Sequence, residues 1–307
     1  MTAATFRAKY EAAARANESL LCVGLDPDPA LMPPGITTLE FLRGIIEATA
    51  DLVCCYKPNA AFFEREGLPG WESLQQVIEA IPDEIPVILD AKRGDVGHTS
   101  EAYARAVFDA LGADAVTANP YLGGDGLEPF LAHEDRHTFV LCRTSNAGAR
   151  DLQDLLVTAL PSEGARSTPN LPPSRGESAV PASAPSQGEG GGGGDSDTPR
   201  PLYEHVAMLA NSWNTRGNVG LVVGATYPAE AARIRALCPE LLFLLPGIGA
   251  QQGDVDAAVR ASLDARGGGI LINSSRGILY AGRDAGFAAA ARTEATRLRD
   301  AINAARP

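Results

Sequence analysis

The chain has 307 residues, of which 45% are hydrophobic and 21% charged, and its formal net charge is -12 at pH 7. This composition is typical of a soluble globular enzyme with a sizeable core, and the negative charge disfavours nucleic-acid binding, which needs clustered Lys and Arg. The start shows no apolar signal segment and no run is long enough to span a bilayer, so we expect a cytoplasmic protein with a small-molecule partner.

Short apolar, β-branched runs alternate with alanine-rich amphipathic stretches along the chain. Eight runs are predicted as strands, at 20–25, 53–56, 86–89, 115–118, 138–142, 219–223, 241–245 and 269–272. Helices are predicted at 2–17, 101–111, 228–237, 255–265 and 284–305. This alternation implies parallel strands joined by crossover helices, and eight such units fit a closed (β/α)8 TIM barrel in the α/β class.

A segment rich in Pro, Gly, Ser and Glu interrupts this pattern from 161 to 200. Such a composition buries too little apolar surface to offset its ordering entropy, so we predict a disordered insert between the fifth strand and its helix. An interdomain linker is the alternative, because such segments often join domains. Neither flank has enough strands to close a barrel alone, so 1–160 and 201–307 are expected to be two parts of one domain.

Cysteine usage indicates a reducing compartment. No Cys-x-x-Cys pair occurs, and most of the cysteines lie in apolar runs, which predicts buried free thiols. The five are Cys22, Cys54, Cys55, Cys142 and Cys238.

Polar side chains follow the predicted strands at the end where a parallel barrel carries its active site. They include Asp26, Lys57, the group Asp90, Lys92, Asp95 and Thr99, then Ser145, Gln251 and Arg276. Side chains alternate along a strand, so Asp90 and Lys92 point the same way, and Asp95 can fold back toward them from the turn. Nearby negative charge favours the ammonium form, which predicts that Lys92 is a positioned acid.

Glycine-rich segments follow the last two predicted strands. Pro246-Gly247-Ile248-Gly249-Ala250-Gln251 and Asn273-Ser274-Ser275-Arg276-Gly277 offer backbone N–H groups, and Gln251 and Arg276 add side-chain donors. The loops after strands seven and eight of such barrels frequently bind phosphate, so we predict a phosphate site. Two ordinary glycine-rich loops are the simpler alternative.

Taken singly, the charged residues also have simpler explanations. Asp95 and Thr99 could cap the next helix, Lys57 could extend to solvent, and Asp26 could end a strand before a proline. These explanations do not account for two lysines and three aspartates at the ends of the first three strands. The convergence favours a functional site.

Metal binding is not expected. The four histidines, at positions 98, 133, 137 and 205, show no metal-ligand spacing. Lys92 would compete with a divalent cation for Asp90 and Asp95. We therefore predict no metal.

The combined motifs resemble the orotidine 5′-phosphate decarboxylase family, in particular its longer bacterial members. The resemblance covers nearly the whole chain apart from the insert, and it rests on Asp90-x-Lys92-x-x-Asp95 with Thr99, Lys57-Pro58-Asn59, Thr144-Ser145-Asn146 and the two glycine-rich segments. It implies a cofactor-free decarboxylation of orotidine 5′-monophosphate to uridine 5′-monophosphate, the last step of de novo pyrimidine synthesis.

The resemblance also implies roles for individual residues. Lys92 would donate a proton to C6 of the ring as carbon dioxide leaves, with Asp90 facing the substrate carboxylate. Asp95 and Thr99 would reach the neighbouring subunit's site, which implies a homodimer. Binding roles would fall to Asp26 and Lys57 at the ribose hydroxyls, Ser145 at the pyrimidine edge, and Gln251 with Arg276 at the phosphate.

Two other functions remain as alternatives. Sugar-phosphate decarboxylases and aldolases of the same superfamily share the Asp-x-Lys-x-x-Asp strand but use Mg²⁺, with an acidic ligand where this chain has Lys57. A barrel that has lost catalysis and only binds a nucleotide is the second alternative, and intact Asp90, Lys92 and Asp95 argue against it.

Overall fold

The computed structural model describes residues 4–158, 198–248 and 255–307. Eight strands form one parallel sheet in the order β2-β1-β10-β9-β8-β5-β4-β3. Parallel bridges of Tyr56 with Val87 and of Asn59 with Asp90 connect the two ends of this order, so the sheet closes into the predicted (β/α)8 barrel. The strands are β1 (Leu21–Leu25), β2 (Cys55–Pro58), β3 (Ile88–Arg93), β4 (Ala115–Ala118), β5 (His137–Arg143), β8 (Val219–Val223), β9 (Leu242–Pro246) and β10 (Ile270–Ser274).

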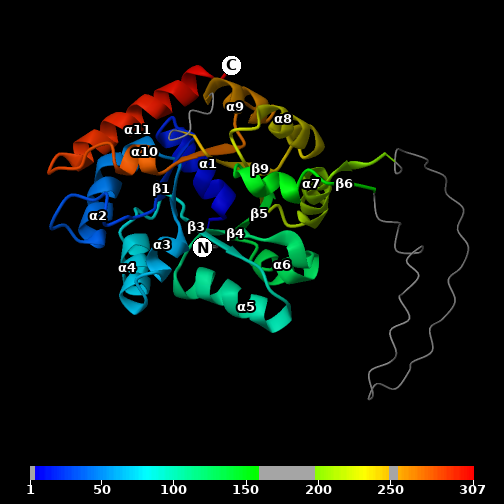
Figure 1. The fold of residues 1–307 in the computed structure, drawn as a ribbon, viewed down its shortest axis with the longest axis horizontal. Helices are drawn as coiled ribbons and strands as arrows, with labels where there is room; N and C mark the ends of the chain where they lie inside the picture. Colours follow the sequence, from blue (N-terminus) through cyan, green and yellow to red (C-terminus); the bar gives the residue numbers. More distant parts are fainter. Residues whose placement is uncertain (1–3, 159–197, 249–254) are drawn as a thin grey trace, which may run out of the picture.

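Helices surround the barrel, as Figure 1 shows. They are α1 (Phe6–Ala16), α2 (Thr38–Thr49), α3 (Ala60–Glu64), α4 (Leu68–Glu79), α5 (Gly97–Arg105), α6 (Gly124–Leu131), α7 (Leu202–Trp213), α8 (Pro228–Leu237), α9 (Val255–Ser262), α10 (Arg276–Leu279) and α11 (Phe287–Ala304). Short 3₁₀ turns η1 (Ala50–Leu52), η3 (Pro120–Leu122) and η4 (Ala147–Asp151) and a π-helical turn η2 (Ala106–Ala110) complete the set. The helix predicted at 101–111 is thus α5 and η2 together.

The first helix closes the amino-terminal end of the barrel. Tyr10 of α1 donates a hydrogen bond to the carbonyl of Ile270 at the start of β10 (2.9 Å). Lys9 pairs with Asp114, directly before β4 (2.9 Å). Because α1 covers the strand starts, the carboxyl ends of the strands are left to form a site.

The hydrophobic strand interiors build the core, and the strand positions agree closely with the sequence prediction. β4 and β8 have the predicted bounds, and all five cysteines are free and buried, as predicted. β3 is longer than its apolar run and continues through Arg93, with an irregular register against β4. Asp90 and Lys92 therefore lie within a strand, since backbone pairing continues after the hydrophobic pattern has ended.

A two-stranded ribbon stands outside the barrel, between β5 and α7. β6 (Leu156–Val157) pairs antiparallel with β7 (Arg200–Pro201), with Val157 opposite Arg200. Arg200, which the sequence analysis placed at the end of the insert, is therefore the first residue of a strand. The predicted insert runs from 161 to 200, and its part from 161 to 197 lies outside the described residues, as does Gln251. None of the helices in the described ranges is both long and apolar enough to cross a bilayer.

Candidate active site

A cavity of about 240 Å³ opens at the carboxyl ends of the barrel strands. Three of the predicted site residues line it, namely Asp26 after β1, Ser145 after β5 and Arg276 at the start of α10. The other lining residues are Phe62, Gly247, Ile248, Asn273, Ser275 and Gly277. The structure thus brings together residues that are up to 250 positions apart, because parallel strands end at one face of the barrel.

Asp90 binds two lysines, one through each carboxylate oxygen. Lys57 Nζ lies 2.8 Å from Oδ2, and Lys92 Nζ lies 2.6 Å from Oδ1. The side chain of Lys57 is 4% exposed and that of Lys92 is 50% exposed. Asn59 Nδ2 lies 3.5 Å from Oδ2 of the same carboxylate. Lys57, Asp90 and Lys92 thus form a row of alternating charges, in which Lys92 is the solvent-exposed end.

The surroundings keep the buried pair charged at neutral pH. Burial by itself would raise the pKa of Asp90, but the positive charges of Lys57 and Lys92 outweigh it and hold this pKa well below its usual range. Burial would lower the pKa of Lys57, but Asp90, and then Asp26, raise it above its ordinary value. Asp90 is therefore a carboxylate and Lys57 an ammonium.

Thr117 is a site residue that the sequence analysis did not identify. Its Oγ1 donates a hydrogen bond to Asp90 Oδ1 (2.8 Å) and accepts one from the backbone N–H of Lys92 (3.0 Å). Lys92 has φ +49°, and within the described ranges Glu18 is the other non-glycine residue with a positive φ. Thr117 thus supports a left-handed backbone that is strained for a lysine. Threonine is ordinary in strands, so the sequence carries no distinctive signal for this role.

Asp95, which the sequence predicts can fold back toward Asp90 and Lys92, pairs with neither lysine of the site in the described part of one chain. Its Oδ1 accepts a hydrogen bond from the backbone N–H of Val96 (2.8 Å), and in the described part of the chain it forms no ion pair with Lys92. Its carbonyl packs against Gly126 of α6, where a Cβ would lie 2.8 Å away. α5 has Val96 at its N-cap without a side-chain bond, so neither Asp95 nor Thr99 caps that helix.

Asp26 has an oxygen available for a ligand. Its Oδ1 is buried and has no hydrogen-bond partner among the described residues. Its backbone carbonyl accepts a hydrogen bond from Tyr280 Oη (2.9 Å), which fixes the loop after β1. A buried oxygen without a partner is costly, so this position favours a bound hydroxyl or amine.

Arg276 stands exposed at the rim of the cavity. In the described part of the chain its guanidinium has no hydrogen bond or ion pair, and it lines the cavity together with Ser275 and Gly277. Gly247 on the opposite side has φ +104°, a conformation that favours glycine. A free guanidinium beside glycine-rich loops suits an anion, and Gln251, the other predicted donor, lies outside the described residues.

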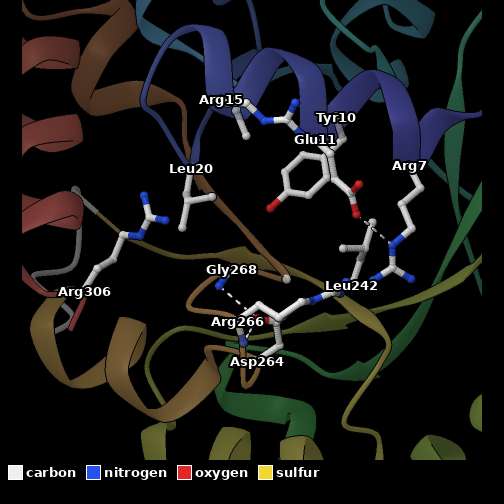
Figure 2. A pocket seen from close by; sticks show the side chains of 12 residues that line it. Arg7, Tyr10, Glu11, Arg15, Leu20, Leu242, Asp264, Arg266, Gly268 and Arg306 are labelled. Atoms are coloured by element: carbon white, nitrogen blue, oxygen red, sulfur yellow. Dashed lines mark hydrogen bonds and ion pairs between the residues drawn. The ribbon is translucent and has the colours of Figure 1, made fainter.

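A second cavity, of about 350 Å³, lies at the opposite end of the barrel between α1 and the loop before β10 (Figure 2). Four of its charged groups pair with protein atoms: Arg7 with Glu11 (3.3 Å), and Asp264 with Arg266 (3.3 Å) and with the backbone N–H of Gly268 (2.9 Å). The amino-terminal face of such barrels serves stability, and catalytic residues come from the carboxyl ends of the strands. We therefore place the candidate active site in the cavity beside Asp26 and Ser145.

No group of three or more His, Cys, Asp or Glu within the described ranges has the arrangement of a metal site. Lys57, which lies within β2, occupies the position at which the magnesium-dependent alternative requires an acidic ligand, and it is already bound to Asp90. The donor set at this end of the barrel is thus suited to an anionic organic ligand.

Comparisons with known proteins agree on one family. The family model described as "Orotidine 5'-phosphate decarboxylase / HUMPS family" matches residues 19–166. The orotidine 5'-phosphate decarboxylase of Roseiflexus castenholzii is 50% identical over 98% of both chains, and that of Azoarcus sp. is 47% identical over 98% of this chain and 99% of its own. Among solved structures, Leishmania donovani OMP decarboxylase matches with a TM-score of 0.76 and 41% identity over 98% of both chains.

Proposed function

The chain belongs to the orotidine 5′-phosphate decarboxylase family of carboxy-lyases, and on that premise we propose that it converts orotidine 5′-monophosphate to uridine 5′-monophosphate with Lys92 as the proton donor. The family acts in pyrimidine biosynthesis, for which we expect a cytoplasmic location. The observation that carries the proposal is the row Lys57, Asp90 and Lys92, whose open end lies at the carboxyl face of the barrel.

The reaction requires a cation that is already in place. Loss of carbon dioxide from an sp² ring carbon leaves an electron pair in the ring plane with little resonance stabilisation. The ammonium of Lys92 stabilises this charge and then transfers a proton to C6, so that one group performs both tasks. Asp90 holds the ammonium at 2.6 Å and faces the departing carboxylate. Because Lys92 supplies the positive charge, the reaction as proposed uses no metal and no cofactor.

The remaining predicted residues would bind the rest of the nucleotide. We assign the ribose hydroxyls to Lys57 and to Asp26, whose buried Oδ1 has no partner among the described residues. Ser145 is assigned to the pyrimidine edge, and Arg276 to the phosphate together with Gln251. Binding energy from the phosphate end would orient the ring against Lys92, so the anion site contributes to rate as well as to affinity.

We further propose a homodimer in which Asp95 and Thr99 complete the partner's site. Asp95 lies on the loop that follows β3 and forms no ion pair with Lys92 in the described part of its own chain. Large apolar side chains are exposed around it: Val96 (53%), Tyr121 (78%) and Leu122 (46%). An exposed apolar patch beside a site is typical of an interface between subunits.

The proposal is tested by following the loss of orotidine 5′-monophosphate absorbance with purified protein in the presence of a chelator. We expect turnover that the chelator does not change. Turnover that stops with the chelator and returns with Mg²⁺ would favour the magnesium-dependent alternative. A folded protein that binds uridine 5′-monophosphate without turnover would instead be a binding protein, and the proposed reaction would be wrong.

A further inference from the structure

Arg143 carries a buried guanidinium at the end of β5, directly before the segment with Ser145. Its side chain is 1% exposed, and it lies 3.3 Å from Asp154 and 3.2 Å from Gln153 Oε1. The guanidinium also stacks over the ring of Tyr227, with Arg143 Cζ 4.2 Å from the ring centroid. Burying a guanidinium costs solvation free energy, and its ion-pair partner Asp154 is 39% exposed, so stability alone does not explain an arginine here. Its partners lie on the two loops beside Ser145.

Gln153 ties the two ends of the Ser145 loop together. Its Oε1 accepts a hydrogen bond from the backbone N–H of Thr144 (2.9 Å), and its Nε2 donates one to Thr144 Oγ1 (2.8 Å). The same hydroxyl donates to Asn146 Oδ1 (2.7 Å). The Gln153 amide thus holds Thr144 directly, and it holds Asn146 through the Thr144 hydroxyl. These two residues are the neighbours of Ser145 in the chain.

Two glycines confine Ser145 from the other side. A Cβ on Gly224 would lie 3.0 Å from the backbone nitrogen of Ser145, and a Cβ on Gly247 would lie 3.5 Å from its Oγ. Gly224 also donates its N–H to the carbonyl of Arg143 (2.6 Å). Ser145 is thus packed against backbone on one side and held by side chains on the other, and it lines the cavity between them.

We propose that Arg143 and Gln153 are positioning residues that place Ser145 against the pyrimidine, so that they set affinity for the base without touching it. This inference rests on the role proposed above for Ser145. Asp154 and Tyr227 hold the guanidinium, and the guanidinium donates to the Gln153 amide. This amide holds the backbone N–H of Thr144 before Ser145 and, through the Thr144 hydroxyl, the side chain of Asn146 after it. A serine on an unrestrained loop would lose the orientation that selective hydrogen bonding to a base edge needs.

The first experiment compares Gln153→Met with wild type, because methionine keeps the length and removes both the oxygen and the nitrogen of the amide. Two ligands are measured: uridine 5′-monophosphate, and ribose 5-phosphate, which lacks the base. We expect the dissociation constant of the nucleotide to rise about five- to tenfold and that of ribose 5-phosphate to change by less than about twofold. Gln76→Met, on the exposed face of α4, is the matched control and should change neither.

A second pair of variants keeps the test valid if Gln153→Met folds poorly. Thr144→Val removes the hydroxyl that Gln153 and Asn146 share, whereas Thr144→Ser retains it. We expect the valine variant to show the same selective loss and the serine variant to restore nucleotide affinity. Adding Gln153→Met to Ser145→Ala should cost little more than Ser145→Ala alone, because both act through one contact.

The outcomes separate this inference from the proposed function. Equal losses for both ligands, or fully additive effects of Ser145→Ala and Gln153→Met, would show that Gln153 serves general stability and overturn the inference. If wild type turns over the substrate and Gln153→Met matches it in both dissociation constants, the inference alone is wrong. If wild type binds the nucleotide without turnover, the proposed reaction fails and the positioning role is still decided by the binding measurements. Absence of nucleotide binding by wild type rejects both.

Discussion

Lys92 and Asp90 form a 2.6 Å ion pair between a side chain that is half exposed and one that is 12% exposed. The buried carboxylate is also bound by Lys57, so it is the fixed partner, and the exposed ammonium is the one that can meet a substrate. The charge row therefore has a direction, from the buried Lys57 to the half-exposed Lys92.

This direction predicts that Lys92→Ala abolishes turnover and spares binding. Loss of both the proton donor and the stabilising charge should lower kcat by at least about 10⁴-fold, with the dissociation constant of uridine 5′-monophosphate within about fivefold of wild type. The matched control is Lys9→Ala at the opposite end of the barrel, where Lys9 pairs with Asp114. The control should lower thermal stability and leave kcat unchanged. A Lys92→Ala protein that still turns over substrate would remove Lys92 as the donor.

Thr117 should affect the rate through the geometry of its neighbours. Thr117→Val keeps the shape and removes the hydroxyl that joins Asp90 Oδ1 to the Lys92 backbone, so we expect kcat to fall about ten- to a hundredfold and KM to change by less than about threefold. Thr117→Ser keeps the hydroxyl and should recover most of the rate. Steady-state kinetics of the three proteins decide the question, and equal rates for the valine and serine variants would show that the hydroxyl has no catalytic effect.

The pKa shifts predict how stability depends on pH. The folded-state pKa of Asp90 is depressed, so its contribution to stability is complete above the unfolded value of about 3.9 and is lost as the pH falls below it. The folded-state pKa of Lys57 is raised, so its contribution is complete below about pH 10.4 and is lost as the pH rises further. Urea unfolding of wild type and Asp90→Asn should give a stability difference that is constant from about pH 5 to 9 and shrinks below about pH 4. A difference that already changes near pH 7 would contradict the assignment.

The proposed homodimer predicts complementation between two inactive proteins. Lys92→Ala lacks its own donor, whereas Asp95→Ala lacks the group that would enter the partner's site. Subunits mixed in equal amounts and allowed to exchange should regain about a quarter of wild-type activity, because half of the dimers are mixed and each contains one intact site. Mixing each variant with itself is the control. No recovery in mixtures whose exchange is verified by mass spectrometry would place Asp95 outside the partner's site.

The ribbon outside the barrel predicts that the segment between its strands can be removed. Val157 pairs with Arg200, and Leu202 donates its backbone N–H to the carbonyl of Leu155 (2.8 Å). The residues that flank the segment on either side therefore already lie side by side. Replacement of residues 159–197 by a turn of about four residues should leave kcat/KM within about threefold and the melting temperature unchanged or higher. A control deletion that also removes 155–158 and 198–202 should lower stability. A large loss of activity in the shorter deletion would assign that segment a role in catalysis.

Local patterns in the sequence were sufficient to predict the barrel. Hydrophobic runs such as 115–118 and 219–223 report burial directly, and their alternation with amphipathic stretches implies the parallel topology. The sequence also identified three residues of the cavity, because a barrel gathers the residues that follow its strands at one face. They are Asp26, Ser145 and Arg276. The chain contains three lysines, and two of them, Lys57 and Lys92, bind Asp90 at the site, whereas Lys9 lies elsewhere. The scarcity of lysine made the positions of these two a further signal in the sequence.

The partners of those residues were decided by the tertiary structure alone. The contact of Thr117 with Lys92 depends on an irregular register between β3 and β4, and the bond from Gln153 to Thr144 depends on how the loop after β5 returns. The carbonyl of Asp95 packs against Gly126 of α6, and its carboxylate forms no ion pair with Lys92 in the described part of the chain. Hydropathy and motifs along one chain report which residues are buried or polar. They do not report which atoms meet when the barrel closes, because that is set by strand register and by loop packing between distant residues.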